Sequence, residues 1–247
     1  LADALYGAAN YWVYWPNNGN GSFGSMVTFT SPPPVDISDI EMADMNRDGY
    51  TDMVYGAADY WAYWPNNGNN SFGALVEMTG DPTVDANDAV LIDMNGDGAS
   101  DVVYGAASYW VYWPNNANGS FGAMVTMTSP PPIDQSDGRL IDLNGDGLTD
   151  LVYGASGYWG YWPNQGNGSF GTLVEMANDP PVDVADIKMS DIDGDGLSDV
   201  VYGAADYWAY WLTKVDNSFG NMVEMTGDPP IDGEDADLVD MDGDGAE

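Results

Sequence analysis

The chain repeats itself at a fixed spacing of 49 residues. A short acidic segment begins at the same point of every copy, at Asp44, Asp93, Asp142, Asp191 and Asp240. No linker, charge block or low-complexity stretch interrupts this register, so residues 1–247 are predicted to form a single domain. Repeats of about 40 to 50 residues are typical of β-propeller blades, each of which is one small sheet.

Each copy contains four candidate strands. In the third copy they are residues 90–92, 102–104, 109–113 and 124–128, with asparagine, glycine and proline between them. The last of these alternates apolar and polar residues, which is typical of a half-exposed strand. The pattern predicts an all-β fold, a five-bladed β-propeller of four-stranded antiparallel blades. A linear β-solenoid is the alternative, but solenoid repeats are usually shorter and their strands parallel.

The two ends of the chain complement each other. Residues 1–3 align with residues 50–52, so the chain enters a blade at its second strand, whereas residues 236–239 supply a first strand. We therefore expect the N- and C-terminal strands to pair and close the ring, with Asp3 completing the acidic segment that Asp240 begins. Closure would remove two open sheet edges. The alternative is that these residues are a segment of a longer series of the same repeats.

The composition excludes several classes of function. Forty acidic residues stand against four basic ones, and the net charge of −36 repels nucleic acid and anionic membrane surfaces. The chain has no cysteine and no histidine, which removes thiolate sites and the usual general base. Hydrophobic residues make up 44% of the chain, enough for a folded core, yet no apolar run approaches the roughly 18 residues of a membrane span.

The first four acidic segments place oxygen-bearing side chains at positions 1, 3, 5 and 9, and glycine at position 6. The fifth has aspartate at positions 1, 3 and 5 and glycine at position 6, and Asp3 is its proposed position 9. Oxygen ligands at this spacing suit a hard cation, and the glycine allows the sharp turn that directs them inward. The backbone carbonyl of position 7 would add one more ligand. The predicted calcium ligands are Asp44, Asn46, Asp48, Tyr50 and Asp52; Asp93, Asn95, Asp97, Ala99 and Asp101; Asp142, Asn144, Asp146, Leu148 and Asp150; Asp191, Asp193, Asp195, Leu197 and Asp199; and Asp240, Asp242, Asp244, Ala246 and Asp3.

Runs of Asp, Asn and Gly also form simple turns. Five copies in one register favour up to five structural calcium ions, because the clustered carboxylates would repel one another without metal. Calcium is preferred over magnesium, since a loop with five protein oxygens suits flexible coordination. Arg47 replaces the glycine at position 4 and is expected to weaken its site. Calcium sites of modest affinity are filled outside the cell, so we expect a secreted or cell-surface protein.

The loop Asp-x-Asx-x-Asp-Gly-x-x-Asp, followed by Val-Tyr-Gly-Ala and later by Ser-Phe-Gly, resembles the FG-GAP or VCBS repeat of integrin α-subunit propellers. Similar repeats occur in integrin-like fungal lectins and in the propeller regions of toxin-complex B components. The resemblance covers every copy. It implies a calcium-bound propeller used for adhesion, glycan binding or protein docking. The integrin ring has more blades than five copies can form.

The third candidate strand carries all ten tryptophans, in the pattern Tyr-Trp-x-Tyr-Trp. Most of these aromatics are expected to fill the wedge between blades. Strand parity places the first tyrosine of this strand at the same end of the blade as an Asp-x-x-Asp pair. Carboxylates beside aromatics commonly hold sugar hydroxyls, although such aspartates also stabilise turns. The candidate ligand-binding residues are Tyr11, Tyr60, Tyr109, Tyr158, Tyr207, Asp36, Asp85, Asp134, Asp183 and Asp232.

These features predict a non-enzymatic binding module whose first expected function is multivalent carbohydrate binding or adhesion. Its partners would be glycans or a protein receptor. The alternative is a structural or protein-docking propeller within a larger toxin-complex-like or fibre-forming surface protein. An enzyme is disfavoured, because a catalytic carboxylate pair is expected once, whereas every acidic pair here recurs five times.

Overall fold

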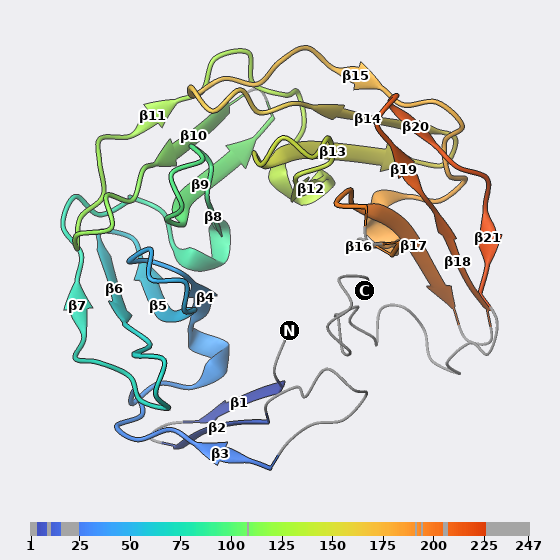
Figure 1. The fold of residues 1–247 in the computed structure, drawn as a ribbon. Helices are drawn as coiled ribbons and strands as arrows, with labels where there is room; N and C mark the ends of the chain where they lie inside the picture. Colours follow the sequence, from blue (N-terminus) through green and yellow to red (C-terminus); the bar gives the residue numbers. More distant parts are fainter. Residues whose placement is uncertain are drawn as a thin grey trace.

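The computed structural model describes residues 4–8, 11–15, 25–107, 109–190, 192–193, 195–204 and 207–225. Five antiparallel sheets are arranged around a central axis (Figure 1). We number them as blades 1 to 5 in chain order. This arrangement confirms the predicted all-β, five-bladed propeller.

The strands of a blade run in sequence from the centre to the rim (Figure 1). The innermost strands are β4 (Glu41–Ala43), β8 (Val90–Ile92), β12 (Arg139–Ile141) and β16 (Lys188–Ser190). The second strands are β1 (Ala4–Ala8), β5 (Asp52–Ala57), β9 (Asp101–Ala106), β13 (Asp150–Ala155) and β17 (Asp199–Ala204). The third strands are β2 (Tyr11–Trp15), β6 (Tyr60–Trp64), β10 (Tyr109–Trp113), β14 (Tyr158–Trp162) and β18 (Tyr207–Trp211). The outer strands are β3 (Val27–Thr28), β7 (Val76–Glu77), β11 (Val125–Thr126), β15 (Val174–Glu175) and β21 (Val223–Glu224).

Blades 2 to 5 are four-stranded sheets, and blade 1 has three strands within the described residues. Blade 5 also has a small hairpin of β19 (Thr213–Lys214) and β20 (Ser218–Phe219). One 3-10 turn precedes each innermost strand: η1 (Ile37–Asp39), η2 (Ala86–Asp88), η3 (Gln135–Asp137) and η4 (Val184–Asp186). The strand predicted at 236–239 and the closure through Asp3 and Asp240 lie outside the described residues.

The outer strands are shorter than predicted, because the chain leaves its own blade for the next one. In blade 3 the Met127 N–H still donates to Trp110 O at 2.9 Å, but the Thr128 N–H donates to Gly168 O of blade 4 at 3.0 Å. A parallel β-bridge joins the blades at this point. The four bridges are Thr30 with Ser71, Thr79 with Ser120, Thr128 with Ser169, and Ala177 with Ser218. We call the segment after each outer strand the tail of its blade.

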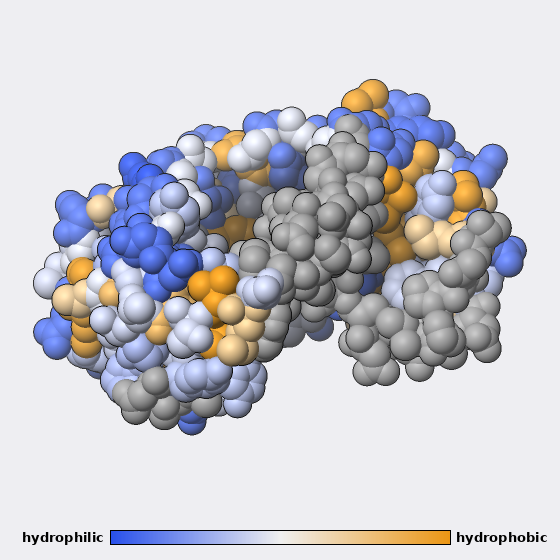
Figure 2. Space-filling view, turned by 60° about the horizontal axis from the view of Figure 1, so that its bottom comes forward, coloured by the Kyte–Doolittle hydropathy of each residue, from blue (hydrophilic) through white to orange (hydrophobic). Residues whose placement is uncertain are grey.

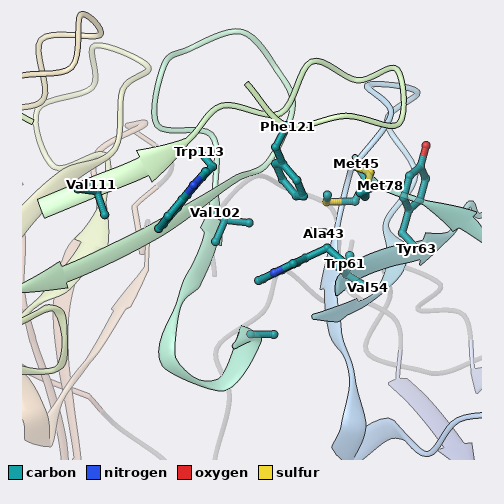
Figure 3. Packing of buried hydrophobic residues seen from close by; sticks show 11 residues of the cluster. Ala43, Met45, Val54, Trp61, Tyr63, Met78, Val102, Val111, Trp113 and Phe121 are labelled. Carbon is teal, nitrogen blue, oxygen red and sulfur yellow. The ribbon is translucent and has the colours of Figure 1, made fainter. Parts of the chain in front are cut away.

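The hydrophobic core lies between neighbouring blades rather than within one. Between blades 2 and 3, Trp61 packs against Phe121 with ring centroids 5.8 Å apart and the planes 80° to each other (Figure 3). The same edge contact joins Trp110 to Phe170 and Trp159 to Phe219. The first tryptophan of the third strand is therefore core, as the sequence predicts: Trp12, Trp61, Trp110, Trp159 and Trp208 are all buried.

The visible surface of the molecule is mostly hydrophilic, with separate hydrophobic patches (Figure 2). Its exposed apolar side chains include the first tyrosine of four third strands, Tyr11, Tyr60, Tyr109 and Tyr158. Within the described ranges, no helix combines the length and the apolar character needed to cross a membrane.

Candidate functional site

Each acidic loop connects the innermost strand of a blade to its second strand. In the loop from β4 to β5, Oδ1 of Asp44 accepts the Arg47 N–H at 2.8 Å, and Oδ2 accepts the Gly49 N–H at 2.9 Å. Asp93 and Asp142 make the same pair of contacts in the next two loops. The glycine at position 6 has a φ between 81° and 90° in all four described loops, a conformation that glycine adopts without steric cost.

The aspartate at position 9 begins the second strand and is completely buried. In blade 3, Oδ2 of Asp101 accepts the Met94 N–H at 3.2 Å, and Oδ1 accepts the Asn115 N–H at 2.7 Å. This one carboxylate thus ties the acidic loop to the long hairpin that follows the third strand. The equivalent residues Asp52, Asp150 and Asp199 make the same two contacts.

Burial of the position 9 carboxylates raises their pKa. The pKa of Asp101 rises to about 7 because of desolvation, opposed by its two backbone hydrogen bonds and increased further by the charges of Asp97 and Asp93. The pKa of Asp150 also rises to about 7, and those of Asp52 and Asp199 rise to about 6, again mainly through desolvation. The acidic groups at positions 1, 5 and 9 therefore lie close enough to feel one another's charge.

The loops offer the donors that a hard cation requires. Oδ1 of Asn95, at position 3 of its loop, is buried and has no hydrogen-bond partner, whereas Asn46 and Asn144 accept a loop N–H there. A carboxylate has about four acceptor sites, so the two N–H groups on each position 9 aspartate leave room for a metal ion. In the described ranges, no three acidic side chains are grouped closely enough to form a ready metal site. The first carboxylate of the loop accepts loop N–H groups. The donor chemistry fits calcium, and the side chains would have to draw closer around it.

Arg47 reaches beyond its own loop. Its guanidinium pairs with the Asp97 carboxylate of the next loop at 2.5 Å, and both side chains are about one-third exposed. In the second and third loops, position 4 faces position 7 of the following loop. Gly96 faces Leu148 and Gly145 faces Leu197, so these glycines have little room for a side chain. Arg47 precedes a loop whose position 7 is the small Ala99. Arginine fits at position 4 here because Asp97, a predicted ligand of the neighbouring loop, balances its charge. In the fourth loop Asp191 lies outside the described residues, as do Asp240, Asp242, Asp244, Ala246 and Asp3.

Sequence reasoning missed the asparagine that follows the Trp-Pro pair. Nδ2 of Asn115 donates to Met45 O of blade 2 at 2.9 Å and to Ser100 O at 3.2 Å. Asn164 makes the corresponding bond to Met94 O, also at 2.9 Å. Recurrence of asparagine at 66, 115 and 164 is the signal that would have indicated this contact between blades.

Among the candidate ligand-binding residues, most of the tyrosines are exposed, and the aspartates accept backbone hydrogen bonds. Tyr11, Tyr60, Tyr109 and Tyr158 are 39% to 47% exposed, and Tyr207 is half-buried. The Asp85 carboxylate accepts the Ala58 N–H at 2.5 Å, and Asp134 and Asp183 do the same for Ala107 and Ser156. These aspartates hold the turn just before each tyrosine, so the structure does bring the two predicted sets together. Asp36 shares their backbone setting, and Asp232 lies outside the described residues.

The fold and the loops define a class of protein, the β-propellers whose blades carry an acidic loop between their first and second strands. Residues 1–55, 93–153 and 142–202 match the family model for the FG-GAP-like repeat. The chain therefore belongs to the FG-GAP-like repeat family. No curated protein sequence matches it.

Two solved structures share the fold. A Photorhabdus luminescens Tc holotoxin pore aligns with 94% of this chain at a TM-score of 0.75 and 21% identity. An Agrocybe aegerita lectin, described by its specific recognition of non-reducing terminal N-acetylglucosamine, aligns with 86% of this chain at a TM-score of 0.57 and 20% identity. The chain spans 12% of the toxin chain and 60% of the lectin chain.

Proposed function

We propose that this propeller is a non-enzymatic, calcium-stabilised binding module that recognises carbohydrates at several equivalent positions. The observation that carries the proposal is the recurring exposed tyrosine at the start of the third strand, held beside a turn that an aspartate fixes. An aromatic face with nearby polar groups suits a sugar, and repetition of weak sites gives avidity. The lectin from Agrocybe aegerita, which shares the fold, adds support.

Calcium would be held by the aspartate and asparagine side chains at positions 1, 3, 5 and 9 of each loop and by the carbonyl of position 7. The ion would supply positive charge to buried carboxylates whose pKa is raised without it. It would also use the otherwise unpartnered Oδ1 of Asn95. An extracellular location is part of this proposal, because such loops fill where calcium is abundant.

The calcium proposal is tested by thermal unfolding in chelator, in calcium and in magnesium. Binding to the folded state alone stabilises by about 2.7 kcal/mol per site when the free ion is at a hundred times its dissociation constant. We expect chelator to lower the melting temperature and calcium to restore it more fully than magnesium. Asn95→Ala is expected to weaken the response, whereas Ser136→Ala, in an exposed turn, serves as the matched control. Equal melting temperatures in chelator and calcium would contradict the proposal.

The carbohydrate proposal is tested on a glycan array with calcium present. The net charge of −36 predicts binding of neutral sugars over sialylated or sulfated ones. A panel of neutral and acidic glycans that shows no binding at all would retire the proposal. Turnover of aryl glycosides would contradict its non-enzymatic part.

A docking function within a larger protein is the second candidate. The likeness to the Photorhabdus luminescens holotoxin has the higher TM-score of the two, and this chain spans only 12% of that protein. A propeller of this kind would present its rim to a protein partner. Co-purification of the chain with one defined protein partner, together with no binding to any glycan on the array, would favour this function.

A further inference from the structure

The blades are of two kinds, and they differ in their tails. Blades 1 and 3 carry Ser-Pro at the third and fourth tail positions, Ser31-Pro32 and Ser129-Pro130. Blades 2 and 4 carry an aspartate instead of the proline, Asp81 and Asp179. A tail touches the following blade through the parallel bridge, so this difference acts on the interface with the next blade.

The aspartate side chain turns back toward its own blade. The Asp81 carboxylate lies near the backbone of Trp61 in β6, and Asp179 lies near that of Trp159 in β14. Oδ1 of each carboxylate is buried, which shows that the side chain is folded in toward the blade. Proline at this position has no carboxylate to offer.

One backbone bond between a tail and the next blade is shorter after the two aspartate tails than after blade 3. The Phe121 N–H donates to Thr79 O at 2.8 Å after blade 2, and the Phe219 N–H donates to Ala177 O at 2.8 Å after blade 4. After blade 3, which has proline, the matching bond from Phe170 to Thr128 O is 3.3 Å long. The companion bond from the tail N–H to the next blade shows no such difference: it is 2.8 Å from Thr30 and 3.0 Å from Thr128 after Ser-Pro tails, and 3.1 Å from Thr79 and 3.0 Å from Ala177 after aspartate tails.

The exposure of the second tryptophan of the third strand differs between the two kinds of interface. After an aspartate tail it is buried, with exposures of 6% for Trp113 and 5% for Trp211. After a Ser-Pro tail it is only half-buried, as Trp64 and Trp162 show. The same tryptophan is thus core or partly exposed according to the blade before it.

A cleft opens beside Trp162. It has a volume of about 510 Å³ and lies between blades 3 and 4, with Pro130 and Leu173 beside the indole and Ser129 and Gln165 as polar groups. All the residues that line it are uncharged. Between blades 1 and 2, the corresponding positions hold Trp64, Leu75, Pro32, Ser31 and Asn67.

We propose that the two interfaces that follow a Ser-Pro tail each bind one neutral pyranose residue, with an apolar face of the ring on Trp64 or Trp162. This inference rests on the proposed carbohydrate function and adds two sites to it, at the opposite end of the third strand from the exposed tyrosines. Indole offers a flat apolar surface to the ring C–H groups. Serine, threonine and the Gln165 or Asn67 amide provide donors and acceptors for hydroxyls. The uncharged lining suits a neutral sugar.

The test counts bound sugars by equilibrium dialysis in calcium, with radiolabelled N-acetylglucosamine as the first probe and the neutral sugar that binds best on the array as the second. Pro130→Asp is expected to place a carboxylate in the lining of the cleft and to remove one bound sugar per chain. Pro132→Asp is the matched control, because Pro132 is exposed in the same segment and does not line the cleft. The reverse change, Asp81→Pro, is expected to open a further site beside Trp113.

The outcomes separate the two proposals. If the unchanged protein binds no sugar, the carbohydrate function fails, and the cleft proposal fails with it. If the unchanged protein binds sugar and Pro130→Asp leaves the count unaltered, the function stands and the cleft proposal is overturned. A Trp162→Leu variant gives a second reading if Pro130→Asp unfolds: it should also lose one bound sugar per chain while its circular dichroism stays that of the parent.

Discussion

At the scale of single residues, the position 9 aspartates are predicted calcium ligands and also accept backbone hydrogen bonds inside the blade. Spacing marks them as calcium ligands, and the structure shows each one buried with a backbone N–H on either oxygen. A buried polar group without a partner is costly, so these contacts stabilise the blade whether or not metal is bound. The same buried aspartate recurs in all four described loops, so it is a structural element of each of these blades.

Replacement of Asp101 by alanine is expected to destabilise the protein strongly. It leaves the Met94 and Asn115 N–H groups buried without acceptors, at about 1 to 3 kcal/mol each, so we expect a loss of roughly 2 to 6 kcal/mol. Asp101→Asn retains one acceptor and should lose less. Urea unfolding measures both, with Asp137→Ala in an exposed turn as the control, expected to stay within about 0.5 kcal/mol of the parent. Similar losses for Asp101→Ala and the control would refute this role.

At the scale of strands, the Tyr-Gly-Ala sequence of the second strand has a steric cause. Its glycine lies opposite the first tryptophan of the third strand, as Gly105 does with Trp110 and Gly154 with Trp159. A Cβ atom on Gly154 would lie 2.5 Å from the Trp159 ring. The glycine therefore makes room for the indole, which in turn packs on a phenylalanine of the next blade.

Gly154→Ala is expected to force Trp159 out of its place and lower the free energy of unfolding. Overpacking of this kind typically costs about 1 to 3 kcal/mol. Near-ultraviolet circular dichroism should report the displaced indole, and urea unfolding the lost stability. Thr172→Ala, at an exposed position, provides the control for a substitution without steric conflict. A Gly154→Ala protein as stable as the parent would show that the sheet relaxes freely at this pair.

At the scale of the whole molecule, the free energy of unfolding is affected both by the negative net charge and by the burial of aspartate carboxylates. The chain carries a net charge of −36 and buries four aspartates in its described loops. Surface repulsion is screened by salt, whereas the cost of charging a buried carboxylate is not. Stability in the absence of calcium should therefore depend on pH in a way that salt does not remove.

We expect the calcium-free protein to lose stability as pH rises through neutrality. The folded-state pKa is about 7 for Asp101 and Asp150 and about 6 for Asp52 and Asp199, against 3.8 without the fold. Between these values the folded state binds more protons than the unfolded state, so the free energy of unfolding falls as pH increases. Urea unfolding in chelator and about 1 M salt, at about pH 5 and about pH 8, measures this. Greater stability at the higher pH would contradict the prediction, and calcium should flatten the dependence.

Local pattern determined much of this protein by itself. The repeat period, the order of four strands per blade and the acidic loops all follow from spacing along the chain, because strands and turns depend mainly on neighbouring residues. The sequence also predicted that most aromatics of the third strand belong to the core, since a strand with aromatics on both faces must be covered on both. The calcium and sugar sites remain predictions.

Only the tertiary structure decided which contacts join distant copies. The bond from Asn115 to Met45 O spans 70 residues, and the pairing of Arg47 with Asp97 crosses from one loop to the next. Trp162 is half-buried whereas Trp113, in the same Tyr-Trp-x-Tyr-Trp motif, is buried, and the blade before Trp162 carries proline where the blade before Trp113 carries aspartate. Near-identical repeats meet different neighbours around the ring, so equal sequences acquire unequal surroundings.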